Sequence, residues 1–133
     1  MSQNDTINLT VDAANNGTTA TEAYTSYSNT GSIHTYIGAD HAPDMQNTLK
    51  LYRTEPSASG NFKGYLDTKI SFGQDYSVPG VDGVNSVRMG FASLQIRVPV
   101  GVSEAQILHL RQRVLAILDT DAIMGKLNYK LEI

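Results

Sequence analysis

Polar and apolar residues alternate along much of the first hundred positions, which is the pattern of half-buried β-strands. The clearest early case is residues 6–11, Thr-Ile-Asn-Leu-Thr-Val, and a stretch rich in Thr and Tyr follows at residues 18–28. Asn16 and Gly17 between them suit a tight hairpin turn, because both tolerate a positive φ. The sequence therefore predicts an opening β-hairpin over residues 6–28.

Further strands are predicted between residues 32 and 100. They cover residues 32–37, 46–55, 61–72 and 87–100. The segment Pro56-Ser57-Ala58-Ser59-Gly60 supplies turn residues between two of these strands. The glycine- and proline-containing stretch 73–86 predicts a long exposed loop before the last strand.

One amphipathic helix is predicted after the strands. Ser103 is a favourable N-cap residue, and Gln106 three positions later completes a capping-box pattern ahead of apolar residues at helical spacing. A second short helix is predicted at residues 120–124, with Gly125 ending it in the left-handed conformation. Residues 126–133 alternate again and predict an extended tail.

Strands precede helices along the chain, which predicts an α+β fold. We expect a five-stranded antiparallel sheet with an N-terminal β-hairpin and two C-terminal helices. We expect one domain over residues 1–133, whose parts are the hairpin 6–28, the main sheet 32–100 with its loop 73–86, the helices 103–125 and the tail 126–133.

Strand parity sorts the main sheet into two faces. One face is apolar, and its members are Leu49, Leu51, Leu66, Thr68, Ile70, Phe72, Ala92, Leu94, Ile96 and Val98. The other carries aromatic residues among cations, and its members are Thr48, Lys50, Tyr52, Thr54, Lys63, Tyr65, Asp67, Lys69, Phe91, Ser93, Gln95 and Arg97.

The apolar face needs a cover, because its burial stabilises by on the order of 25 cal/mol per Å². One long helix and one short helix are too few for a sheet of this size. A second copy can supply further helices, so we predict an obligate homodimer. The residues expected at its interface are Leu94, Ile96, Leu108, Leu110, Val114, Leu115 and Leu118.

The charges are unevenly distributed, although the formal net charge is only -3. Residues 1–45 contain five acidic residues and no Lys or Arg, whereas residues 46–97 contain six basic and four acidic residues. The chain can therefore present an acidic surface and a mildly basic one. The alternative is that these are ordinary solvated charges.

The 133 residues include no cysteine, which excludes a disulfide framework and a thiolate metal site. Residues 1–6 lack the basic start and apolar core of a secretory signal peptide. No apolar run reaches the roughly 20 residues that span a bilayer. We therefore expect a cytosolic fold with no membrane partner.

No catalytic constellation stands out in the sequence. His34, His41 and His109 lack metal-ligand spacing, and no phosphate-binding or dinucleotide-binding glycine motif is present. We predict no enzymatic activity, no metal and no cofactor. A zinc site at His34 and His41 remains a minor alternative, as does a hydrolase or isomerase that uses these two histidines with Asp44.

The polar face is the one candidate site. Single-stranded RNA is bound by stacking unpaired bases on aromatic side chains and by placing cations near phosphates. A solvent-exposed sheet face, however, often carries Thr, Tyr and Lys without any binding role. A second alternative is a carbohydrate-binding or adhesion module, in which Tyr24, Tyr27 and Tyr36 would form a sugar platform.

Several features between residues 48 and 118 occur in a characteristic order. The hairpin of residues 51–63, Leu-Tyr-Arg-Thr-Glu-Pro-Ser-Ala-Ser-Gly-Asn-Phe-Lys, comes before the loop 73–86. The strand that ends in residues 94–100, Leu-Gln-Ile-Arg-Val-Pro-Val, is followed by Ser-Glu and the helix. This arrangement resembles the coat proteins of single-stranded RNA bacteriophages, the leviviruses, with the rest of the chain matching in pattern only.

The resemblance implies homodimers that assemble into an icosahedral capsid and package single-stranded viral RNA. It implies location in the virion, synthesis in the bacterial cytoplasm, a phage maturation protein as a further partner, and repression of translation through an RNA hairpin as an added expectation. The loop 73–86 would gather at symmetry axes through Pro79, Gly80, Asp82 and Gly83.

The resemblance also implies that the polar face lies on the inside of the shell. The RNA-binding residues expected there are Thr48, Lys50, Tyr52, Tyr65, Lys69, Phe91, Ser93, Gln95 and Arg97. Phe91 falls where the family places a stacking tyrosine, and Ser93 falls where it places an asparagine. Asp67 on the same face is unusual beside phosphates.

Overall fold

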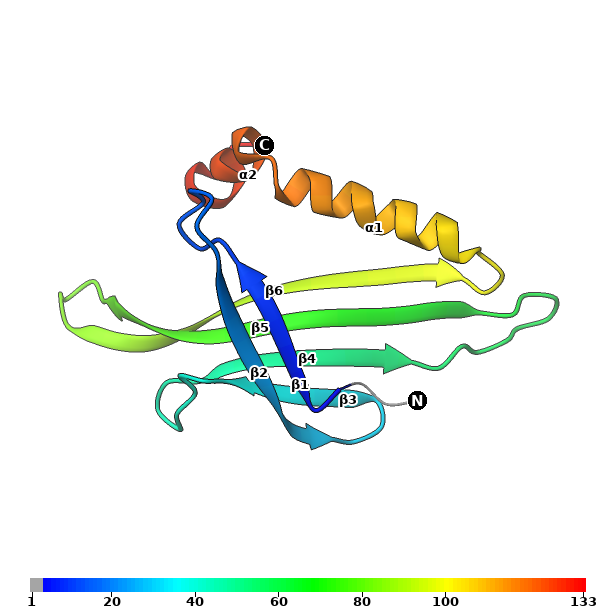
Figure 1. Ribbon diagram of the computed structural model, residues 1–133, viewed down its shortest axis with the longest axis horizontal. Helices are drawn as coiled ribbons and strands as arrows, with labels where there is room; N and C mark the ends of the chain where they lie inside the picture. Colours follow the sequence, from blue (N-terminus) through cyan, green and yellow to red (C-terminus); the bar gives the residue numbers. More distant parts are fainter. Residues whose placement is uncertain (1–3) are drawn as a thin grey trace. The chain divides into compact units, whose positions relative to one another are not determined.

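A computed structural model describes residues 4–133 of the chain, which divide into two units (Figure 1). The first unit comprises the described residues up to Pro56 together with Leu66–Arg97. The second comprises Ser57–Tyr65 and Val98–Ile133. Within residues 4–133, every helix falls short of the length and apolar character that spanning a bilayer requires.

The first unit is built on a six-stranded sheet whose strands lie in sequence order. The strands are β1 Thr6–Val11, β2 Ala20–Asn29, β3 Ile33–Gly38, β4 Asn47–Thr54, β5 Tyr65–Pro79 and β6 Asn85–Pro99. Strands β1 to β5 pair antiparallel, and β6 is hydrogen-bonded beside β5. The predicted strands are all present, but the count differs from five, because the opening hairpin joins the same sheet through β2 and β3.

The predicted loop 73–86 is too long. β5 continues to Pro79 and β6 begins at Asn85, so the connection between them comprises only residues 80–84. Gly73 falls inside the predicted loop, but it pairs with Thr48 inside the sheet. A Cβ at Gly73 would lie 3.2 Å from the Thr48 Oγ1 atom. Gly73 is thus needed for close packing within a strand. Composition alone does not distinguish such a glycine from one in a loop.

The connection between β1 and β2 is a wider loop than the predicted tight turn at Asn16 and Gly17. The Asp12 carboxylate accepts hydrogen bonds from the backbone N–H of Asn16 at 3.0 Å and of Gly17 at 2.8 Å. Positive φ angles occur at Asn15 and Gly17, 53° and 86°, and not at Asn16. An aspartate that captures backbone donors in this way stabilises a longer loop.

The core of the first unit lies on the apolar face. Tyr24, Tyr36 and Leu49 are buried there, and the rings of Tyr24 and Phe72 meet edge-on with centroids 5.9 Å apart. The partly buried residues that pack against these three are Ile7, Leu9, Leu51 and Phe72. The predicted apolar face is therefore sealed by the chain itself near β3, and it becomes more exposed toward β5 and β6.

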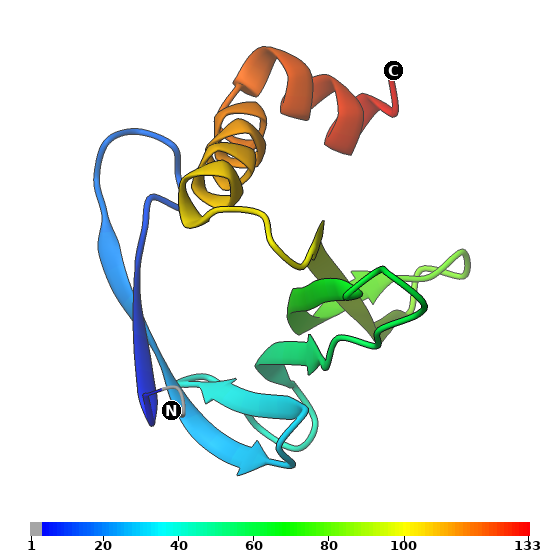
Figure 2. The ribbon, with the colours of Figure 1, turned by 90° about the vertical axis from the view of Figure 1, so that its right-hand side faces the viewer.

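The second unit contains the helices α1 Glu104–Leu118 and α2 Asp121–Gly125 and a π-helical turn, η1 Lys126–Lys130 (Figure 2). Two predictions here are wrong. Gly125 is right-handed, with φ -64°, and the left-handed residue is Leu131, with φ 56°. The tail is also helical for one turn instead of extended, because a helical turn satisfies its backbone groups locally whereas a strand needs a neighbour.

The predicted capping box of α1 is confirmed. The Ser103 hydroxyl accepts a hydrogen bond from the Gln106 N–H at 3.2 Å, and the Gln106 side chain accepts one from the Ser103 N–H at 3.1 Å. We expect Ser103→Ala to lower the free energy of unfolding by about 1 kcal/mol, since it orphans a helix donor. Urea titration at one protein concentration measures this loss. Ser103→Asp keeps a capping oxygen and should stay near wild type; equal losses in both variants would contradict the role of the cap.

Candidate nucleic-acid interface

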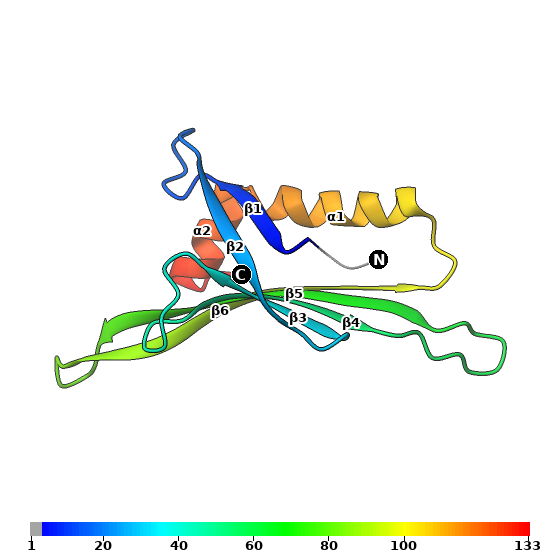
Figure 3. The ribbon, with the colours of Figure 1, turned by 60° about the horizontal axis from the view of Figure 1, so that its bottom comes forward.

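The register between β4 and β5 places the candidate residues on one face of the sheet. Thr48 lies opposite Gly73, Lys50 opposite Ser71, Tyr52 opposite Lys69 and Thr54 opposite Asp67. Residues directly opposite each other in an antiparallel pair point to the same side. Figure 3 shows β3 to β6 side by side, so this face extends across several strands.

Strand β6 continues the same face. The Gln95 amide donates a hydrogen bond to the Asp67 carboxylate at 2.8 Å, which fixes Gln95 on the side of Asp67. Alternation then brings Phe91, Ser93 and Arg97 to that side. We call this surface the polar face; within the first unit its members are Thr48, Lys50, Tyr52, Thr54, Asp67, Lys69, Phe91, Ser93, Gln95 and Arg97.

Two predicted residues do not belong to this unit. Lys63 and Tyr65 lie in the segment Ser57–Tyr65 of the second unit. There the Tyr65 ring packs edge-on against Phe62, with centroids 5.0 Å apart. The RNA-binding role of Tyr65 therefore remains a prediction.

The polar face offers aromatic surface together with positive charge. The Lys69 ammonium lies 4.4 Å from the centroid of the Tyr52 ring, a cation–π contact. Phe91 is 74% exposed. Lys50 and Arg97 add two further cations to the same side. Such a surface can stack unpaired bases and neutralise phosphates.

Sequence reasoning missed Met89 as a member of this side. A Cβ at Gly73 would lie 3.7 Å from the Met89 sulfur, so Met89 reaches over the Gly73 position of the neighbouring strand. Met89 also has the parity of Phe91. Extending the alternation of β6 by two residues would have found it.

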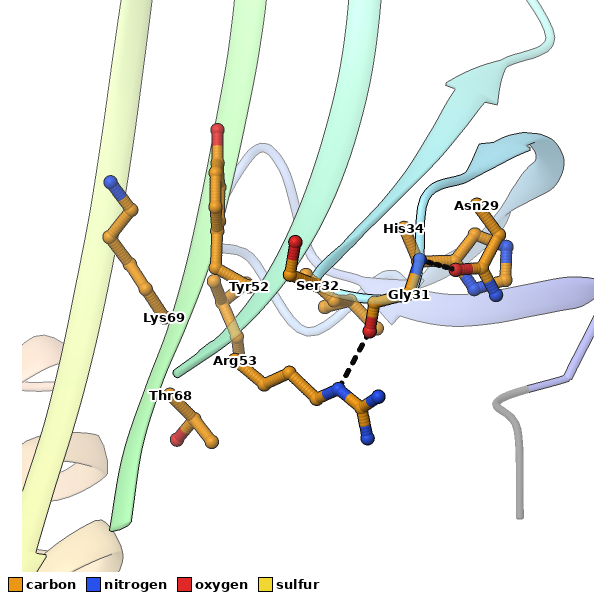
Figure 4. A pocket seen from close by; sticks show the side chains of 10 residues that line it. Asn29, Gly31, Ser32, His34, Tyr52, Arg53, Thr68 and Lys69 are labelled. Atoms are coloured by element: carbon orange, nitrogen blue, oxygen red, sulfur yellow. Dashed lines mark hydrogen bonds between the residues drawn. The ribbon is translucent and has the colours of Figure 1, made fainter. Parts of the chain in front are cut away.

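A cavity of about 640 Å³ lies where β3 begins, but it is not confined to the polar face (Figure 4). In Figure 4 Tyr52 and Lys69 extend to one side of the sheet, whereas Arg53 and Thr68 extend to the other. The Arg53 Nε–H donates to the Gly31 carbonyl at 2.7 Å and ties β4 to the turn before β3. The residues that line the cavity therefore come from both sides of the sheet, and we do not assign the cavity to the polar face.

The apolar residues predicted at a dimer interface remain partly or largely exposed in the single chain. Leu94 and Ile96 are half-buried, and on α1 Leu108, Leu115 and Leu118 are 45%, 55% and 53% exposed. Leu110 is exposed and Val114 is half-buried. The interface assignment itself stays a prediction.

The turn between β5 and β6 projects apolar side chains into solvent. Pro79 ends β5, and Gly80, Asp82 and Gly83 lie in the turn. The Asp82 carboxylate accepts the Val84 N–H at 3.0 Å, and Val81 is fully exposed. The structure thus shows a closed turn whose tip is apolar.

The structure does not bring together the residues that two of the alternatives from the sequence require. Tyr24 and Tyr36 are buried, at 6% and 0% exposure, and only Tyr27 of the three tyrosines is open to solvent, so they form no sugar platform. His34 bonds to Ser26 and Tyr36, whereas His41 accepts the Asn47 N–H at 3.1 Å. The two histidines therefore serve separate local networks.

Comparisons with solved structures find virus-like particles and coat proteins of bacteriophages and levi-like viruses. A chain of the virus-like particle of bacteriophage AVE019 aligns with a TM-score of 0.76 at 16% identity, covering 96% of each chain. The virus-like particle of Wenzhou levi-like virus 4 aligns with a TM-score of 0.70 at 20% identity, covering 79% of this chain and 73% of that one. The bacteriophage EMS014 coat protein aligns with a TM-score of 0.63 at 17% identity, covering 88% and 74%.

At the level of sequence, neither a family model nor a curated protein matches this chain. Structural similarity at such low identity establishes the arrangement of strands and helices. That arrangement is an antiparallel sheet followed by two C-terminal helices, as the sequence predicted. The chain therefore has the fold of the coat proteins of levi-like bacteriophages.

Proposed function

We propose that the protein is a capsid subunit, whose homodimers assemble into an icosahedral shell that packages single-stranded RNA. The observation that carries this proposal is the exposed apolar surface of α1 and of strands β5 and β6. A chain with a coat-protein fold and this uncovered surface is incomplete alone. A second copy supplies apolar helices of the right kind, and identical chains form two-fold dimers most commonly.

Exposed apolar side chains in both units support a permanent dimer, because obligate interfaces are rich in apolar contacts and bury about 2,000 to 5,000 Å² in total. Leu94 and Ile96 of the sheet and Leu108, Leu110, Val114, Leu115 and Leu118 of α1 are the proposed contact residues.

Negative-stain electron microscopy of the purified recombinant chain tests the assembly. We expect closed particles of uniform diameter, and nuclease-treated particles should release protected RNA on extraction. A chain that stays monomeric over a wide range of concentration would overturn the proposal. Closed particles without RNA would overturn the packaging role alone.

The polar face is proposed to bind RNA from the inside of the shell. Lys50 and Lys69 lie on β4 and β5 of this face, and Lys69 covers the Tyr52 ring. Phosphate contacts dominate the affinity for nucleic acid, and each contact to a single strand contributes about 0.7 to the slope of log K against log salt. Thr48, Phe91, Ser93, Gln95 and Arg97 complete the proposed surface. Tyr65, which belongs to the second unit, is proposed separately as an RNA contact.

We expect Lys50→Glu combined with Lys69→Glu to lower the RNA content of purified particles severalfold, because both changes place repulsive charges beside the phosphates. The ratio of absorbance at 260 and 280 nm, followed by RNA extraction, measures the content. Lys126→Glu with Lys130→Glu makes the same charge change in η1 and should leave RNA content near wild type. Equal RNA content in the two double variants would remove the assignment of the polar face.

Further parts of the proposal concern the assembled particle. The turn with Pro79, Gly80, Asp82 and Gly83 is proposed to meet its copies around symmetry axes, where the exposed Val81 finds apolar contacts. The chain would be made in the bacterial cytoplasm and reside in the virion, with a phage maturation protein as a further partner. Repression of translation through an RNA hairpin would use the same polar face.

A further inference from the structure

Asp67 is an acidic residue among the cations of the polar face, and electrostatics alone does not explain its position there. Lys69 lies two residues along the same strand, and Thr54 lies directly opposite on β4. A carboxylate at this place repels the phosphates that Lys50, Lys69 and Arg97 attract. A neutral polar residue would preserve the hydrogen bond to Gln95 without that repulsion. Asp67 therefore calls for a role that needs the carboxylate itself.

The hydrogen bond between Gln95 and Asp67 orients a set of donors and acceptors toward solvent. The Gln95 amide nitrogen uses one of its two hydrogens for the Asp67 Oδ1 atom at 2.8 Å. Its second hydrogen is still able to donate, and each carboxylate oxygen has two lone pairs. Gln95 is exposed and Asp67 is half-buried, so the pair faces the open side of the sheet. From β6 to β5, the pair presents one donor, the second amide hydrogen of Gln95, followed by two acceptors, the carboxylate oxygens of Asp67.

Only one of the four RNA bases has the complementary edge. The Watson–Crick edge of guanine carries the O6 acceptor, then the N1–H donor, then the N2 amino donor. Adenine and cytosine place an acceptor, and uracil places a second carbonyl, where the site requires a donor. An acceptor facing a carboxylate leaves both groups unpaired and repelling.

A stacking surface lies next to this pair. Tyr52 is opposite Lys69, which makes it the diagonal neighbour of Asp67 across β4 and β5. Diagonal neighbours in an antiparallel pair are about 7 Å apart, which is within reach of an aromatic ring. Unpaired bases in single-stranded RNA are recognised by this combination of stacking and hydrogen bonds to their exposed edge.

We propose that Asp67 and Gln95 form a reading site for one unpaired guanine in the packaged RNA. The inference rests on the proposed RNA-binding role of the polar face and adds base selectivity to it. The carboxylate accepts from N1–H and from the N2 amino group, and the Gln95 amide donates to O6. The repulsion that Asp67 causes toward phosphates is then offset only where a guanine is present.

Binding of four fluorescent RNA 12-mers to the purified full-length chain tests the site. Each RNA is oligouridine with G, A, C or U at one central position, and anisotropy is read at low salt below the concentration at which particles form. We expect the guanine RNA to bind at least about fivefold more tightly than the other three, the lower end of what a bidentate base contact discriminates.

Asp67→Asn is expected to abolish the preference for guanine while binding of the other RNAs becomes slightly stronger. Asp75→Asn is the matched control, since it removes one negative charge from the same strand and keeps an acceptor for the Gln46 N–H that Asp75 binds at 3.0 Å. The control should gain general affinity and retain the preference.

The outcomes separate this inference from the proposed function. Equal binding of all four RNAs by the unchanged chain, or preference for another base, would overturn the guanine site and leave RNA binding in place. A preference that persists in Asp67→Asn would overturn the assignment to Asp67. Failure of the unchanged chain to bind any of the RNAs would overturn the RNA-binding role itself.

Discussion

Replacing Leu108 and Leu115 together by aspartate is expected to abolish particle formation. The two residues are 45% and 55% exposed in the single chain and are two turns apart on the same side of α1. In a dimer they would be buried against apolar partners, and an unpaired carboxylate there costs several kcal/mol. Size-exclusion chromatography with light scattering, together with electron microscopy, measures the loss of assembly.

The matched control uses the same chemistry on the polar side of the helix. His109→Asp with Ala116→Asp also introduces two carboxylates seven residues apart into α1, at exposed positions roughly 100° around the helix from Leu108 and Leu115. This variant should still assemble. Leu115→Ala is a milder change that removes side-chain contacts without a charge, and it should raise the concentration needed for assembly. Normal particles from the Leu108 and Leu115 double aspartate variant would contradict the dimer surface.

The apolar side chains that the single chain leaves exposed were predictable, because apolar periodicity in the sequence does not depend on which chain covers the surface. Leu94 and Ile96 alternate with polar residues along β6, and the apolar positions of α1 recur at helical spacing. The single chain covers Leu49 through Tyr24 and Tyr36, a contact that depends on how β2 folds back on β3. The sequence thus identified the apolar face but not which part of it the chain seals by itself.

Strand positions were predictable where alternation was bounded by turn residues. Residues 32–37 were predicted and β3 spans Ile33–Gly38; residues 46–55 were predicted and β4 spans Asn47–Thr54. The prediction failed at β5, because Gly73 serves side-chain packing inside a strand. A Cβ at Gly90 would come within 2.8 Å of the Tyr76 ring, so glycine is what allows Tyr76 to lie across the neighbouring strand.

The sidedness of the polar face was predictable for a geometric reason. The side-chain period of a strand is two, so one correct assignment fixes every other residue on that strand. Predicting which side chains touch between strands also requires the register of strand pairing. The Lys69 contact with Tyr52 and the hydrogen bond between Gln95 and Asp67 both depend on which residues lie opposite each other. Sequence periodicity does not contain that information.

Tyr24 and Tyr27 are three residues apart on β2, so strand alternation already places them on opposite faces of the sheet. Tyr24 is buried and Tyr27 is 70% exposed, and the pairing of β2 with β3 shifts between Ser26 and Ser28. A β-bulge of this kind reorients the residues beyond it. The three tyrosines that the sequence grouped into one sugar platform therefore belong to different environments.

Tyr36→Ala is expected to lower the free energy of unfolding by about 3 to 5 kcal/mol, the range found when a large aromatic side chain is removed from a core. Tyr36 is completely buried and stacks on His34 with ring centroids 4.2 Å apart. Its hydroxyl donates to the Asn4 carbonyl at 2.8 Å and lies 3.2 Å from the His34 Nδ1 atom. Truncation leaves a cavity and two polar groups without their partner.

Urea unfolding followed by circular dichroism measures this loss, at one protein concentration because self-association adds to the apparent stability. Tyr27→Ala is the matched control, and a change at such an exposed position should stay within about 0.5 kcal/mol of wild type. Comparable losses in the two variants would contradict the assignment of Tyr36 to the core.

The same side chain predicts how stability depends on alkaline pH. Burial, and to a lesser extent the nearby Asp5 carboxylate, raises the pKa of Tyr36 above its ordinary value of 10.0. The unfolded chain therefore releases this proton first, so the contribution of Tyr36 is fully present below that value and declines as pH rises past it. Tyr36→Phe keeps the ring and removes the ionisable group, so it should flatten the decline between about pH 9 and about pH 11. Burial also raises the pKa of Tyr24, so part of the decline should persist in this variant, and an unchanged slope would show that the Tyr36 hydroxyl is not buried in solution.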